Sequence, residues 1–139
     1  MTVYLLTISV AILYAFIRAK HDSYISHGKW KIWAFIEGVL VCTSVCVFIS
    51  LGFGTPWWTL FVLIPLFAFY FWLFFDCVQG QIRAGSILHL GDKGFDAEMR
   101  AMFYYNLPIW GWKETGAIRL IFFKVFWIVL LSGAYFAMV

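Results

Sequence analysis

The chain has 139 residues, of which 64% are hydrophobic and only 12% are charged, and its mean hydropathy is +0.90. A soluble domain carries roughly a quarter charged residues, so this composition argues against a water-soluble fold. It predicts a single all-α transmembrane domain, residues 1–139, whose main solvent is the lipid bilayer. The formal charge of +3 is modest, and we expect no nucleic acid partner.

The first apolar run predicts a transmembrane helix over residues 2–18. Its basic residues, Arg18 and Lys20, follow the apolar stretch, whereas those of a signal peptide precede it. We therefore expect this helix to be uncleaved.

Residues 38–75 contain no charged side chain and are too numerous for one span. They predict two spans, residues 30–51 and 56–78, joined by a tight turn over residues 52–56. Pro56 suits the first position of the second of these helices, and Pro65 is expected to kink it.

The longest polar segment, residues 79–114, lies between the third span and a fourth, which is predicted over residues 117–139. Asp96 can cap a short helix that ends near Tyr105, with Met99 and Met102 on one side. We expect this helix to lie at the membrane interface. The predicted fold is therefore a four-transmembrane-helix bundle with an interfacial helix between helices 3 and 4.

Charged residues are confined to residues 18–37 and 76–124. With four spans, all ten Lys and Arg residues fall on one side of the bilayer. Because basic loops face the cytoplasm, we expect both chain termini outside and the charged loops inside.

The same topology gathers imidazole and carboxylate groups at the cytoplasmic face. Such groups bind zinc, manganese or iron, and they can relay protons. No spacing among them forms a recognised metal motif, so a solvated rim with incidental histidines is the alternative. The candidate ligands are His21, Asp22, His27, Asp76, His89 and Asp96.

Glu37 lies inside the second predicted span, where a charge costs a few kcal/mol unless it is paired. Lys124 and Arg119 lie at comparable depth in the fourth span, and either would offset that cost. The pair would fix the helix register or form part of a site for protons, ions or a ligand. Asp76, at a helix C-terminus that favours cations, also needs a partner, such as Arg83, His21 or a metal.

Small residues recur every fourth position along the second span, at Gly38, Cys42, Cys46 and Ser50. This row predicts a face on which helices pack closely. We interpret it as a contact between helices of one chain, and a contact between two chains is the alternative. Cysteines four apart on a helix have poor disulfide geometry, so Cys42, Cys46 and Cys77 are interpreted as packing residues.

A set of short motifs resembles small polytopic membrane proteins of bacterial phages and prophages. The resemblance covers about a third of the chain and implies a shared cluster on the cytoplasmic side, in which Asp76, Asp96 and the histidines act together. We expect the membrane to be a bacterial inner membrane. It assigns no activity. The motifs are Lys20-His21-Asp22, His27-Gly28-Lys29, Phe75-Asp76, Leu88-His89-Leu90-Gly91 and Phe95-Asp96.

The chain contains no phosphate-binding glycine loop, no nucleophile elbow and no HExxH motif. We therefore expect a small non-enzymatic membrane component that assembles with itself or with other membrane subunits. A metal- or proton-dependent site at the cytoplasmic face, in a small enzyme or an ion-conducting element, is the alternative. A pore-forming effector ranks below both, because the outer halves of the helices offer only Ser, Thr and Tyr as polar groups.

Overall fold

The computed structural model describes residues 1–24, 31–85 and 115–139, and it describes side chains for residues 1–21, 36–82, 85 and 118–139. Within the backbone ranges the protein is helical and contains no strand, which confirms the expected all-α class for that part of the chain. The interfacial helix expected near residues 96–105 lies outside the described residues. The helices are α1 (Thr2–Tyr24), α2 (Lys31–Gly52), the 3-10 turn η1 (Trp57–Thr59), α3 (Leu60–Ala84) and α5 (Thr115–Met138).

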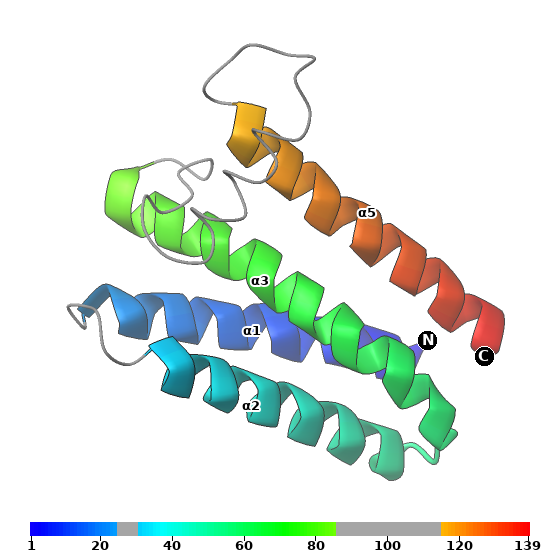
Figure 1. The fold of residues 1–139 in the computed structure, drawn as a ribbon. Coiled ribbons are helices and arrows are strands. Elements are labelled where there is room, and N and C mark those ends of the chain that lie inside the picture. Colours follow the sequence, from blue (N-terminus) through cyan, green and yellow to red (C-terminus); the bar gives the residue numbers. More distant parts are fainter. Residues whose placement is uncertain (25–30, 86–114) are drawn as a thin grey trace.

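Helix α3 occupies the centre of the arrangement and contacts α1, α2 and α5 (Figure 1). The two chain termini and the α2–α3 turn lie at one end of the helices. The opposite end holds the last turns of α1 and α3 and the first turns of α2 and α5. Each described ionisable side chain of Asp, Glu, Lys, Arg or His therefore lies in the half of its helix nearer this second end, which we call the charged end.

Three helices are long and apolar enough to cross a membrane, namely Thr2–His21, Trp57–Ile82 and Ile118–Met138. The second of these, at 26 residues, is about 39 Å long, and the hydrocarbon core measures about 30 Å. The apolar part of α2 with described side chains, Ile36–Gly52, is shorter. The span predicted over residues 30–51 therefore stays a prediction.

The helices extend beyond their apolar runs at the charged end. Helix α1 continues past residue 18 to Tyr24, and α3 continues past residue 78 to Ala84, where Gly85 ends it with a left-handed φ of 64°. The residues after 78 that were assigned to the loop include Gln79 and Gln81, whose side chains suit a helix. The length of each apolar run predicted the part of the helix that could cross a membrane. It did not predict the residue at which the helix ends.

The turn between α2 and α3 is held by local hydrogen bonds. Gly54 adopts a φ of 61°, which a side chain would disfavour. Thr55 donates its backbone N–H to the carbonyl of Ser50 at 2.9 Å, and the Thr59 hydroxyl donates to the carbonyl of Pro56 at 2.7 Å. We expected Pro56 to be the first residue of the helix. It lies one residue earlier, immediately before η1, which begins at Trp57.

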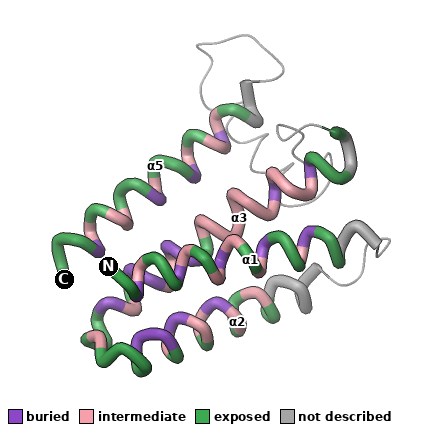
Figure 2. Tube along the Cα trace, turned by 180° about the vertical axis from the view of Figure 1, so that it is seen from behind, coloured by how far each residue is buried: buried purple, intermediate pink, exposed green. Residues whose placement is uncertain are grey.

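A row of small side chains lets α1 approach its neighbours closely. Thr7, Ala11, Ala15 and Ala19 are four residues apart and completely buried. Buried segments recur along α1 in Figure 2. Among the helices, α1 makes the most extensive contact with α3. Small residues at this spacing are a known helix-packing device in membranes. The row is visible in the sequence, but our prediction from the sequence covers only the corresponding row on α2.

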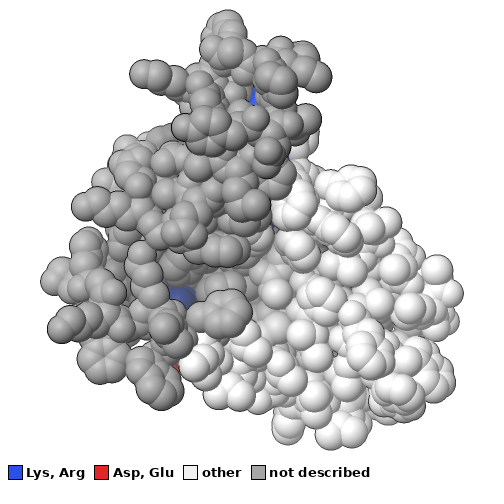
Figure 3. All heavy atoms as spheres, in the orientation of Figure 1, with Lys and Arg blue, Asp and Glu red and all other residues white. Residues whose placement is uncertain are grey.

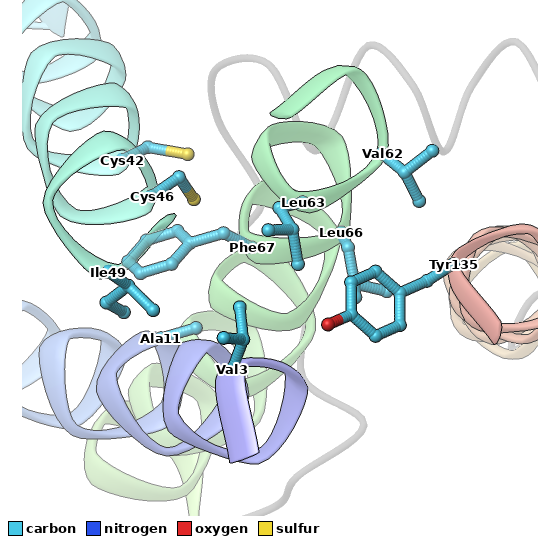
Figure 4. Packing of buried hydrophobic residues seen from close by; sticks show 10 residues of the cluster. All are labelled: Val3, Ala11, Cys42, Cys46, Ile49, Val62, Leu63, Leu66, Phe67 and Tyr135. Atoms are coloured by element: carbon cyan, nitrogen blue, oxygen red, sulfur yellow. The ribbon is translucent and has the colours of Figure 1, made fainter. Parts of the chain in front are cut away.

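The small row of α2 also faces the interior of the chain. Cys42, Cys46 and Ser50 are buried, and the two cysteines belong to the same core cluster as Leu63 and Phe67 of α3 (Figure 4). The Cys42 thiol donates to the carbonyl of Ile64, with sulfur and oxygen 3.3 Å apart. Cys42, Cys46 and Ser50 therefore pack within the chain. Gly38, by contrast, has nothing within 4 Å of where a Cβ would be.

Candidate functional site

The first element of the candidate site is an ion pair buried between α3 and α5. Lys124 donates a hydrogen bond from Nζ to Oδ2 of Asp76. The lysine side chain is completely buried and that of Asp76 is 5% exposed. Trp72 lies one turn before Asp76 on α3, so both face the same neighbour, and its ring centroid is 4.0 Å from Nζ. The ammonium of Lys124 is thus held by a carboxylate and an aromatic face.

This pair is enclosed in an apolar part of the molecule. Asp76 lies about 9 Å from the end of its apolar span at Ile82, and Lys124 is about 9 Å from the start of its own at Ile118. Two charges taken out of water need good geometry and further polar or aromatic contacts to repay their desolvation. The Trp72 ring supplies one such contact, since a desolvated cation–π interaction contributes about 2 kcal/mol.

A second ion pair joins α1 to α2. Arg18 donates from Nη1 to both carboxylate oxygens of Glu37, at 3.0 Å and 2.9 Å. The Arg18 side chain is 17% exposed and that of Glu37 is 50% exposed. Because the carboxylate is only partly enclosed, this pair contributes less to stability than a buried one when water reaches it.

Both carboxylates have a partner that we did not expect. Glu37 was expected to meet Lys124 or Arg119, and it meets Arg18 instead. Asp76 meets Lys124. The partners expected for Asp76 were Arg83, His21 or a metal, and the side chain of Arg83 lies outside the described residues. For Glu37 the reason is helix adjacency, because α2 lies beside α1 and α3 separates it from α5 (Figure 1). Equal depth in the membrane does not tell which helices are neighbours.

Most of the proposed metal ligands have no described side chain. His27, His89 and Asp96 lie outside the described residues, and Asp22 belongs to α1 without a described side chain. His21 is exposed in the last turn of α1. Over the side chains that are described, no group of three or more His, Cys, Asp or Glu residues could hold a metal ion. The metal set therefore stays a prediction.

A group of hydroxyls links α1 to α5 at the end opposite the charges. The Tyr4 hydroxyl donates to Ser132 Oγ at 2.8 Å, and Ser132 Oγ donates to the carbonyl of Ile128 at 2.6 Å. Tyr135 is almost completely buried beside Tyr4, with ring centroids 5.5 Å apart. The sequence predicts Ser, Thr and Tyr as the only polar groups in this half, but no spacing rule connects Tyr4 with Ser132 at the other end of the chain.

An open apolar groove lies between α1 and α2 in the same half of the molecule. Its volume is about 520 Å³. The surface around the helices carries few charges: on the face seen in Figure 3, coloured charged atoms appear only among or beside the undescribed residues. The groove residues are Leu6, Val10, Ser44, Val45, Phe48 and Ile49.

The chain matches no protein-family model, no curated protein and no solved structure. The resemblance to small phage and prophage membrane proteins accordingly stays a prediction.

Proposed function

We propose that the protein is a small non-enzymatic integral membrane component that assembles with copies of itself. The observation that carries this proposal is that the acidic side chains near the charged end are paired with basic side chains of neighbouring helices. Asp76 and Glu37 each meet a basic side chain on a neighbouring helix. Ion pairs of this kind set helix register, which is the best attested structural role of buried charges.

The apolar surface supports the same proposal. Helix α5 packs on α3 along Leu120, Lys124, Ile128 and Tyr135, and its opposite side exposes large apolar groups. The outer side of α2 does likewise. Lipid tails would cover such surfaces equally well in a monomer. The support for assembly comes from the large size of the exposed side chains and from the position of the two surfaces on opposite sides of α3. The most exposed groups are Phe48, Leu51, Phe122, Phe126 and Val129.

In the proposed setting four helices, α1, α2, α3 and α5, cross a bacterial inner membrane. The charged end faces the cytoplasm and both termini face outward, because basic residues favour the cytoplasmic side. Cysteine accessibility at Thr2 and Val139, tested in intact cells with an impermeant maleimide, checks this orientation. Labelling of Thr2→Cys and Val139→Cys only after cell lysis would contradict it.

Native mass spectrometry of the detergent-extracted protein tests the assembly. We expect oligomers of the chain, with or without further subunits. A monodisperse monomer from which no partner co-purifies would refute the proposed function.

A second candidate function is a proton- or metal-dependent site at the charged end. The observation in its favour is the enclosed acid–base pair of Asp76 and Lys124 beside Trp72. If this pair relays protons, Asp76→Asn abolishes proton flux into liposomes that contain the protein. If the site holds zinc, manganese or iron, the purified chain carries that metal, and His21→Ala lowers its content. Absence of both effects would eliminate this candidate.

A further inference from the structure

Two exposed helix faces have the same spacing and lie on opposite sides of α3. In each, residues follow one another at intervals of three and four, which places them along one side of a helix. The outer face of α2 consists of Glu37, Leu40, Ser44, Phe48 and Leu51, and that of α5 of Arg119, Phe122, Phe126, Leu130 and Gly133. All of these residues are exposed except Arg119, which is half-buried.

Contacts within the chain fix the relative depth of the two faces. The Tyr4–Ser132 hydrogen bond sets α5 against α1, and the Arg18–Glu37 pair sets α2 against α1. Both α2 and α5 run from the charged end to the other end (Figure 1). At 1.5 Å per residue, Ser44 then lies within about one turn of the depth of Phe126. Two copies with the same orientation in one bilayer lie at the same depth, so Ser44 of one copy is level with Phe126 of the other.

From this match we propose that α5 of one copy docks on the groove between α1 and α2 of the next copy. The inference rests on the proposed function, since it names the surface through which copies assemble. Phe126 enters the groove beside Ser44, where a small side chain leaves room for a ring. An aromatic anchor in an apolar pocket is the usual centre of a strong protein interface.

Charge and size complement each other along the rest of the two faces. Glu37, whose carboxylate remains half exposed beside Arg18, comes to the depth of Arg119 in the next copy. At the other end Leu51 comes to the depth of Gly133, so a large side chain again meets a small one. The same faces placed against themselves would bring Glu37 against Glu37, which like-charge repulsion opposes. Charge complementarity therefore favours an α2–α5 contact over a symmetric α2–α2 contact.

Such a contact uses different surfaces on the two copies, and repetition closes a ring when the rotation between copies permits it. Each copy in the ring contributes one groove and one α5 face. The buried ion pair of Asp76 and Lys124 lies on the inner side of α5, so it holds the docking helix in place on α3.

Cross-linking between two differently tagged full-length chains tests the contact. One chain carries Ser44→Cys and the other Phe126→Cys, and both are reconstituted together in liposomes and treated with a short bifunctional maleimide. The matched control replaces Ser44→Cys with Leu13→Cys, which is exposed on α1 outside the groove and within about a turn of the same depth. We expect at least tenfold more heterodimer with Ser44→Cys than with Leu13→Cys, after subtraction of the background from the native cysteines.

Native mass spectrometry of the unmodified chain is measured alongside, which separates two kinds of failure. If the chain is oligomeric and the two cysteine pairs cross-link equally, the docking contact is wrong and the proposed function stands. Dominant Ser44→Cys homodimers would also overturn it, in favour of a symmetric contact. A monomeric chain without partners, its groove covered by lipid alone, would refute both.

A groove-filling substitution gives an independent readout. Ser44→Trp occupies the space that we assign to Phe126, and we expect the oligomer in native spectra to fall at least tenfold. Leu13→Trp adds the same ring at an exposed position outside the groove and is expected to leave the oligomer unchanged. Equal spectra for both variants, with helix content preserved by circular dichroism, would overturn the docking contact.

Discussion

Replacement of Lys124 by Met tests whether the buried ion pair holds α5 to α3. The methionine keeps the length and apolar stem of the lysine and removes its charge. Asp76, 5% exposed, is then left with a buried negative charge that has lost its ammonium partner. Trp72 loses the cation 4.0 Å from its ring centroid.

The size of the effect follows from these two losses. Removal of one partner from a buried ion pair costs about 3–5 kcal/mol, and loss of a desolvated cation–π contact costs about 2 kcal/mol. The two losses share one ammonium and do not add in full. We therefore expect Lys124→Met to lower the free energy of unfolding by about 3–5 kcal/mol.

The double variant Asp76→Leu, Lys124→Met separates pairing from packing. Apolar replacement of both members of a buried ion pair is often neutral or stabilising, so we expect most of the loss to be recovered. Unfolding in mixed micelles with increasing dodecyl sulfate, followed by tryptophan fluorescence and circular dichroism, gives the four free energies of the cycle. A Lys124→Met variant within about 1 kcal/mol of the parent chain would refute the reasoning, as would a double variant less stable than either single one.

Three further predictions use the same unfolding assay. Glu37→Gln is expected to cost about 1 kcal/mol or less, because the Glu37 side chain is half exposed; a cost equal to that of Lys124→Met would contradict this ranking. Ala15→Leu should cost about 1–3 kcal/mol, since Ala15 is completely buried and a larger side chain overpacks the α1 seam. Its matched control, Leu13→Ala at an exposed site, should change stability by about 0.5 kcal/mol or less, and equal effects at the two positions would show that the seam is not tightly packed. Ser132→Ala removes the acceptor of the Tyr4 hydroxyl and should cost about 0.6 kcal/mol, the average for such bonds in membranes; a cost above about 2 kcal/mol would mean that the hydroxyls act as a larger network.

Sequence patterns located the helices because a single physical rule governs them. An apolar segment placed in lipid must satisfy its backbone internally, so each long uncharged run becomes a helix. The rule predicted helices where α1, α2, α3 and α5 occur. It did not predict that α1 and α3 continue to Tyr24 and Ala84, because polar residues at a membrane surface form a helix or a loop with similar ease.

Pairing of charges was the part that sequence reasoning could not resolve. Glu37, Asp76, Arg18 and Lys124 were all recognisable as ionisable groups at one end of apolar helices. Which carboxylate meets which cation depends on the order of the helices around α3, and an apolar run carries no information about its neighbours. The signal that was available and missed is the Ala-rich row of α1, which marks that helix as one that packs closely.

The two ion pairs have unequal roles because of where they lie. Arg18 and Glu37 join helices that α3 also contacts, so α1 and α2 remain packed on α3 even without that pair. Helix α5 packs mainly on α3, and Lys124 is the only described cation on its buried side. The Tyr4–Ser132 hydrogen bond adds a contact to α1 near the other end of the helix. The helix that we assign to docking with the next copy is thus the one that carries the buried charge pair. Loss of that pair should therefore weaken assembly as well as folding, and Lys124→Met should lower the oligomer in native spectra even in detergent where the monomer stays helical.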